Sequence, residues 1–159
     1  MSAGIGCFFL VALLAAAVRL GGPATAFLNV PSFVFLVLGT LALSLMSFGV
    51  RGLAGALGAL RVLVADVSPA DLSSRDASVL RGIIVHAYTW AAVLTLIGMV
   101  QMLRHLGDLS MLGRGIGVLL LVPFYAMVGA ECVLRPVLHH VRWKLARSAE
   151  EDSSESAEE

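Results

Sequence analysis

Four long stretches of the chain are apolar and almost free of charge. Residues 1–18 and 20–50 carry no charged side chain, and residues 82–103 carry none if His86 is neutral. Residues 115–134 carry one, Glu131. Because a helix that spans a bilayer needs about 20 mostly apolar residues, this pattern predicts four transmembrane helices, at about 2–20, 30–50, 81–104 and 113–138.

The same stretches predict an all-α integral membrane protein. Backbone groups in lipid must be hydrogen-bonded within their own segment, and a transmembrane barrel would need short strands of alternating polarity, which these stretches lack. Charged residues make up 14% of the 159-residue chain, against about 25% in a typical soluble domain, and the mean hydropathy is +0.91. These values argue against a soluble globular domain, a disordered chain and a nucleic-acid-binding protein.

Basic residues predict the orientation, because cytoplasmic loops carry an excess of Lys and Arg. One side of the predicted bundle has eight of them: Arg51, Arg61, Arg75, Arg81, Arg135, Arg142, Lys144 and Arg147. The other side has three: Arg19, Arg104 and Arg114. Both termini and the loop 51–80 are therefore predicted to be cytoplasmic. Six of the eleven acids lie in the last ten residues, so a disordered acidic tail is expected over 148–159.

The ends of the predicted helices leave alternatives open. The first segment can be a secretory signal peptide with a cleavage-like site at Ala24-Thr25-Ala26, although it lacks the basic leading region of such peptides. The amphipathic stretch from Val50 to Val67 can continue the second helix into the cytoplasm. Ser73, Ser74 and Asp76 offer an N-cap for the third helix.

Small and polar residues inside the apolar segments are candidates for close packing or for function. Thr40, Ser44 and Ser47 share one face of the second helix, which favours helix–helix packing, with pore lining as the alternative. Gly113 and Gly117 form a small-xxx-small pair, which is a packing signal.

Glu131 is the only carboxylate within a predicted span. Arg135 follows four residues later, in the favourable order for an ion pair on a helix. Two interpretations remain: a paired carboxylate that reaches the interface, or a proton or cation site. In the third helix, Thr95 and Gly98 share a face, and His86 near the cytoplasmic end is typical of an interfacial hydrogen-bonding residue.

No pattern in the sequence indicates an enzyme. A nucleophile elbow, a phosphate-binding glycine loop, zinc-ligand spacing and paired catalytic carboxylates are all missing from the sequence. His139 and His140 are adjacent and point to different helix faces, so they form a poor metal site. We expect no catalytic residue, no cofactor, no bound metal and no nucleic-acid partner.

Three stretches occur in an order and spacing that resemble a known family. Residues 27–40 run from Pro31-Ser32 through an apolar stretch to Gly39-Thr40, and residues 94–103 and 109–136 follow, the last containing Tyr125 and Pro136. They resemble the second, third and fourth helices of the MotA/TolQ/ExbB proton-channel family, in particular its MotA branch. The resemblance covers about half of the chain.

The resemblance implies a protein of the bacterial inner membrane that forms a homopentamer, whose third and fourth helices line a central pore. Two single-span helices of the MotB/ExbD/TolR kind would lie inside, each with an aspartate that carries a proton or a sodium ion. Thr95 would face that aspartate, Gly98, Pro123 and Tyr125 would line the pore wall, and Glu131 would be a carboxylate on the cytoplasmic side. Gly39 and Thr40 would belong to the packed second helix. The partners expected are therefore further copies of the chain, a single-span protein and membrane lipid.

Some residues depart from the family pattern. Val122-Pro123 occupies the position of a fourth-helix threonine, Leu38 replaces a glycine, and a loop of about 30 residues stands where MotA has a large cytoplasmic domain. Torque on a flagellar switch through that domain is therefore not expected. We expect the channel-forming subunit of a minimal ion-driven motor. The alternatives are a non-conducting pentameric scaffold or an unrelated four-helix bundle.

Overall fold

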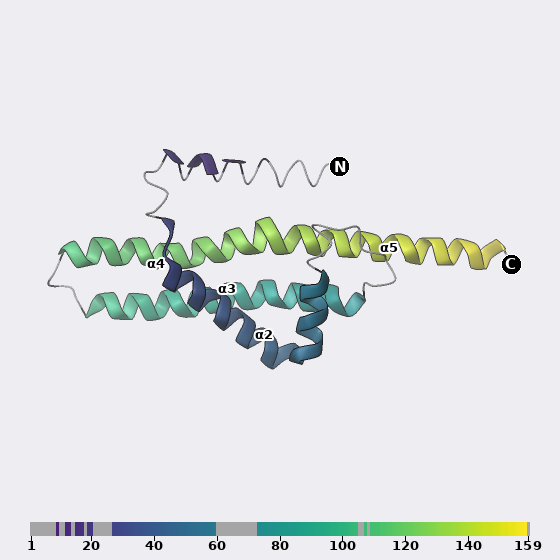
Figure 1. Cartoon of the computed structure of the whole chain (residues 1–159), viewed down its shortest axis with the longest axis horizontal. Helices are drawn as coiled ribbons and strands as arrows, with labels where there is room; N and C mark the ends of the chain where they lie inside the picture. The colour runs from purple at the N-terminus through teal and green to yellow at the C-terminus, as the bar shows by residue number, and fades with distance from the viewer. Residues whose placement is uncertain are drawn as a thin grey trace.

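The computed structural model describes residues 9, 12–13, 15–17, 19–20, 27–59, 73–104, 107 and 109–158. Its principal elements are four helices, α2 (Val30–Ala59), α3 (Ser74–Leu103), α4 (Leu109–Gly129) and α5 (Arg135–Glu158), with a π-helical turn, Ala130–Leu134, between α4 and α5. Helices α4 and α5 form one long rod that lies antiparallel beside α3, and α2 crosses this pair obliquely (Figure 1).

Within the described part of the chain, three helices are long and apolar enough to cross a membrane: Val30–Ala59, Ser74–Leu103 and Leu112–Glu150. Many large apolar side chains on them are exposed, and Met46 (84% exposed) and Leu120 (61%) are examples. Exposed apolar surface of this extent fits contact with lipid or with other protein chains. The structure therefore supports an all-helical membrane protein with three candidate spans. The additional span predicted at 2–20 falls largely outside the described residues.

Helix α2 is bent at Gly49, which has φ 69° and ψ 175°. This left-handed φ suits glycine because a side chain at Cβ would be strained there. The helix resumes after Gly49 and runs to Ala59 in a different direction (Figure 1). The helix thus continues past residue 50, where the apolar span was predicted to end, and reaches Ala59.

Helix α3 begins at Ser74, seven residues before the predicted start at 81. Ser73 is its N-cap, and its Oγ accepts a hydrogen bond from the Arg75 backbone N–H at 3.2 Å. In return, the Asp76 carboxylate accepts from the Ser73 N–H at 3.0 Å. This capping box satisfies backbone donors that the helix start would leave unpaired, so the helix extends beyond the uncharged stretch that the sequence prediction used.

The wide turn between α4 and α5 precedes Pro136. The Arg135 N–H donates to the Ala130 carbonyl, five residues back, instead of four. Pro136 has no N–H, and its ring would crowd the carbonyl four residues earlier in a regular α-helix. A wider turn removes this conflict, and it changes the direction in which Glu131 and the residues after it point.

Helix α5 remains helical to Glu158, whereas the sequence predicted a disordered tail over 148–159. The acidic composition of the tail, taken alone, favours disorder. However, alanine and glutamate are good helix formers, and extending an existing helix avoids the cost of nucleation.

Two clusters of buried residues hold the helices together. Val79, Leu80 and Ile83 of α3 pack with Val137 and Val141 of α5. Leu36 of α2, Ala91 of α3, and Val122 and Ala126 of α4 form the second cluster. The two clusters fix the rotation of α3 relative to the α4–α5 rod, and this rotation brings the polar residues described below together.

Candidate functional site

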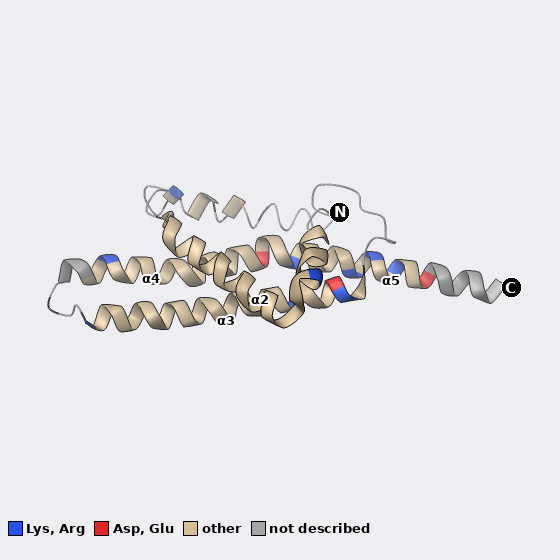
Figure 2. Ribbon diagram, turned by 60° about the horizontal axis from the view of Figure 1, so that its bottom comes forward, with Lys and Arg blue, Asp and Glu red and all other residues tan. Residues whose placement is uncertain are grey.

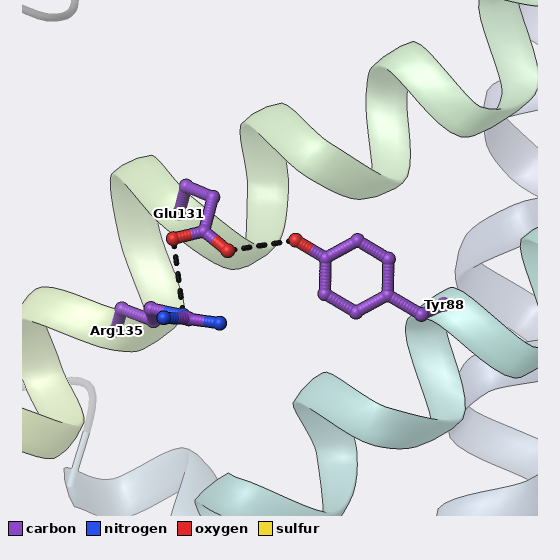
Figure 3. Close-up of polar contacts among 3 residues, drawn as sticks. All are labelled: Tyr88, Glu131 and Arg135. Atoms are coloured by element: carbon purple, nitrogen blue, oxygen red, sulfur yellow. Dashed lines mark hydrogen bonds and ion pairs between the residues drawn. The ribbon is translucent and has the colours of Figure 1, made fainter.

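Glu131 forms the centre of a three-residue polar cluster inside the third candidate span. Its Oε1 accepts a hydrogen bond from the Tyr88 hydroxyl at 2.7 Å, and its Oε2 lies 3.0 Å from Arg135 Nε. Tyr88 comes from α3, whereas Glu131 and Arg135 come from the π-helical turn and the start of α5 (Figure 3). The Glu131 side chain is 36% exposed and that of Arg135 60%, so the cluster lies at the edge of the helix pair.

Both carboxylate oxygens of Glu131 are therefore engaged, one by a neutral donor and one by a charged donor. Each oxygen keeps a further lone pair that can accept from water or meet a cation. The ion pair of Glu131 with Arg135, predicted from their spacing, is present. The pairing of Tyr88 with Glu131 had no signal in the sequence, because the two residues lie 43 positions apart on different helices.

Thr95 lies on the same face of α3 as Tyr88, seven residues further along the helix. It is half-buried, and its hydroxyl donates to the Ala91 carbonyl at 2.8 Å. Gly98 allows close contact between α3 and α4, because a Cβ there would lie 2.7 Å from Leu119 Cδ1. In this chain, Gly98 is therefore part of the contact between α3 and α4.

Tyr125, predicted as a pore-wall residue, connects α4 to the segment that precedes α2. Its hydroxyl donates to the Phe27 carbonyl at 2.6 Å and accepts from the Asn29 N–H at 2.8 Å. Its ring meets that of Phe33 edge-on, with centroids 5.8 Å apart. Pro123, two residues earlier, is half-buried within α4. The Tyr125 side chain therefore acts as a clamp that holds the segment before α2 against α4.

The residues predicted to pack helices behave differently from one another. Thr40 and Ser44 are buried, and their hydroxyls donate to carbonyls one turn back on α2. At Gly39, a Cβ would collide with the indole of Trp90, which donates to the Phe35 carbonyl at 2.9 Å. By contrast, a Cβ at Gly113 or at Gly117 would meet nothing within 4 Å among the described residues.

His86 of α3 is held between two hydroxyl groups of α2. Ser44 Oγ lies 3.1 Å from Nδ1 and Ser47 Oγ lies 3.3 Å from Nε2. Since the Ser44 hydroxyl donates to the Thr40 carbonyl, it is free to accept from an Nδ1–H, and Nε2 of the neutral ring then accepts from Ser47. The sequence placed these serines on one face but did not connect them to His86.

Two cavities open beside α3. The apolar cavity, about 750 Å³, lies between α3, α4 and the start of α2, and Leu94 and Val118 are among its lining residues. The basic cavity, about 820 Å³, lies between α3 and α5 and is lined in part by Arg81, Arg135 and Arg142. Within the described part of the chain, no three His, Cys, Asp or Glu side chains group together as metal ligands.

No family model and no curated protein matches this chain. The resemblance to the MotA/TolQ/ExbB family therefore stands on the residues that carry it and remains a prediction. The arrangement of Thr95, Tyr88 and Glu131 in the structure has to be interpreted from its own chemistry.

Proposed function

We propose that this protein is the channel-forming subunit of a minimal ion-driven motor of the bacterial inner membrane, similar to MotA/TolQ/ExbB proteins. It would work as a homopentamer around a single-span partner whose intramembrane aspartate carries a proton or a sodium ion. Its own role is to provide the wall of the ion pathway, without enzymatic chemistry. The observation that carries the proposal is the Tyr88–Glu131–Arg135 cluster inside a candidate span, because ionisable groups at such positions are costly to retain without a function.

A polar stripe along α3 supports an ion pathway. Thr95 and Tyr88 share a face and lie about 10 Å apart along the helix axis, given a rise of 1.5 Å per residue. Each hydroxyl can donate and accept a hydrogen bond. Thr95 would meet the partner's carboxyl group within the span, and Tyr88 with Glu131 would receive the proton closer to the cytoplasm.

Unoccupied small-residue and apolar surface supports an assembly of several chains. Gly113 and Gly117 have nothing within 4 Å of their Cβ positions in the described chain. In membranes, such small-residue surfaces allow a helix of another chain to approach closely. Ile116 and Leu120, on the same helix, are exposed as well, so α4 has a face available for a neighbouring subunit.

A non-conducting pentameric scaffold is the second candidate, and different contacts favour it. The Thr95 hydroxyl is bonded to its own helix backbone. Arg135 already balances the charge of Glu131, and Tyr125 is used as a clamp within the chain. A scaffold of this kind would assemble as the motor subunit does but would carry no ions.

Proton flux through reconstituted vesicles tests the motor proposal. The protein is reconstituted together with the single-span protein encoded beside it, and acidification of the vesicle lumen is followed with a pH-sensitive dye. We expect Thr95→Ala and Glu131→Gln to reduce the flux at least tenfold. Thr89→Ala is the matched control, because the Thr89 hydroxyl makes the same type of backbone hydrogen bond, to Val85, on the exposed side of α3.

Each outcome separates the candidates. A flux of protons or sodium ions that falls in the Thr95 and Glu131 variants and persists in the Thr89 variant supports the motor. If an assembled complex passes neither ion, the scaffold replaces it. If all three variants conduct like the wild type, the proposed pathway is wrong.

A further inference from the structure

The basic cavity between α3 and α5 has the composition of a headgroup site. Arg81 extends from α3, and Arg135 and Arg142 extend from α5, with His139 beside them. Ile84 of α3 and Leu138 of α5 add apolar surface to the same cavity. Ile84 is buried, whereas the arginines are exposed, so the cavity has an apolar floor and a cationic opening.

The positive charge of this cavity is mostly uncompensated. Among the described residues, neither Arg81 nor Arg142 forms a salt bridge with a carboxylate. Arg135 contacts Glu131 through Nε at 3.0 Å, and the remaining donors of its guanidinium group can bind another anion. Arginine is well suited to this purpose because its planar group can donate two parallel hydrogen bonds to a phosphate.

The position of the cavity favours a ligand from the membrane. Lys and Arg residues, blue in Figure 2, gather around the beginning of α3 and along the first half of α5. Trp143, which also lines the cavity, is half-exposed, and the Arg147 guanidinium carbon lies 5.4 Å from its ring centroid. Tryptophan is enriched at the level of lipid headgroups, so this end of the helices fits the membrane–water interface.

We infer that the basic cavity binds the headgroup of an anionic phospholipid. Its phosphate lies among Arg81, Arg135 and Arg142, and its acyl chains leave along Ile84 and Leu138 into the bilayer. A volume of about 820 Å³ is within the range of cavities that hold small molecules, roughly 300–1,000 Å³. Basic cavities between helix ends at the membrane surface are suited to such headgroups.

The proposed lipid would also affect the polar cluster. Arg135 belongs to both places, because it pairs with Glu131 and lines the basic cavity. A phosphate bound to the remaining donors of this guanidinium group shares its positive charge with Glu131. Anionic lipid would therefore weaken the hold of Arg135 on the carboxylate, independently of whether the protein conducts ions.

Native mass spectrometry of the full-length protein in detergent tests this inference. Phosphatidylglycerol or phosphatidylcholine of equal chain length is titrated, and the apparent affinity for each is measured. We expect phosphatidylglycerol to bind at least tenfold more tightly. Arg81→Gln and Arg142→Gln should each weaken it about fivefold, the factor that corresponds to roughly 1 kcal/mol per basic residue near a charged surface.

Arg104→Gln is the matched control, because Arg104 lies at the other end of α3 and is also exposed. The inference is overturned if this variant loses as much affinity as the other two, or if both lipids bind equally. Competition by inorganic phosphate at equal concentration would also overturn it, because the site would then belong to a soluble anion.

A second measurement needs no substitution. In vesicles of the wild-type protein, brominated phosphatidylglycerol should quench tryptophan fluorescence more strongly than brominated phosphatidylcholine at the same mole fraction. Trp143 lies in the cavity wall and would be in contact with the retained lipid. Equal quenching by the two lipids would contradict selective binding, even if the arginine variants fail to fold.

Discussion

The hydroxyl of Tyr88 donates a 2.7 Å hydrogen bond to Glu131, 43 residues further along the chain. This bond connects the middle of α3 with the π-helical turn that joins α4 and α5. It is a charge-assisted hydrogen bond, and such bonds contribute more to stability than neutral ones. The pair therefore links the stability of the helix bundle to the charge state of the Glu131 carboxylate.

Tyr88→Phe should destabilise the protein by about 1.5–3 kcal/mol, the usual contribution of a hydrogen bond to a charged group. Unfolding in detergent, followed by circular dichroism, measures the change. The same substitution in a Glu131→Gln background should cost less, because the charged acceptor is already gone. Equal costs in the two backgrounds would mean that the hydroxyl and the carboxylate do not interact.

Pro136→Ala should weaken the interaction between Tyr88 and Glu131. An alanine supplies the missing N–H, so the π-helical turn is no longer needed to avoid the proline ring. If the turn becomes a regular α-helix, Glu131 rotates relative to α3. The coupling energy of Tyr88 and Glu131, measured by a double-mutant cycle, should fall by at least half. An unchanged coupling energy would show that the turn has another cause.

Gly39→Ala should destabilise the packing of α2 on α3. The added methyl group collides with the Trp90 indole, whose N–H donates to the Phe35 carbonyl, and overpacking of this kind costs about 1–3 kcal/mol. Gly58→Ala is the matched control, since a Cβ there meets nothing within 4 Å. Because alanine favours a helix over glycine by about 1 kcal/mol, Gly58→Ala should leave the stability unchanged or raise it. If both variants behave alike, the close contact at Gly39 is not formed.

Tyr125→Phe should release the segment ahead of α2 without affecting ion flux. It removes both hydrogen bonds of the hydroxyl, to Phe27 and Asn29, but keeps the ring against Phe33. Hydrogen exchange of the Asn29 amide should accelerate by roughly tenfold, which corresponds to about 1.4 kcal/mol for the lost bonds. If the flux is lost and amide exchange is unchanged, Tyr125 is a pore residue, as the family resemblance implies.

Element type and approximate position could be predicted from the sequence, because the thickness of a bilayer dictates long uncharged helices. The cap at Ser73 and Asp76 could also be predicted, because a capping box is formed by residues close together in the sequence. The start of α3 was nevertheless placed seven residues late, because the prediction followed the charges and not the cap. The end of α5 was missed because the acidic tail was judged by composition without the helix that leads into it.

The polar contacts could be predicted only within one helix. Four-residue spacing indicated the pair of Glu131 and Arg135, and it is present. The contacts of Tyr88 with Glu131 and of His86 with Ser44 depend on how the helices are rotated against each other. That rotation follows from the buried clusters and from the extra residue in the π-helical turn, neither of which has a simple periodic signal in the sequence.

The mass of the purified complex in mild detergent, with and without the single-span protein encoded beside it, tests the central claim most directly. The motor account predicts five copies of this chain, and a gain in mass equal to two copies of the partner when the two are produced together. A pentamer that captures no partner would favour the scaffold. A monomer or a dimer under both conditions would contradict the account, and with it the mechanism drawn from the MotA/TolQ/ExbB resemblance.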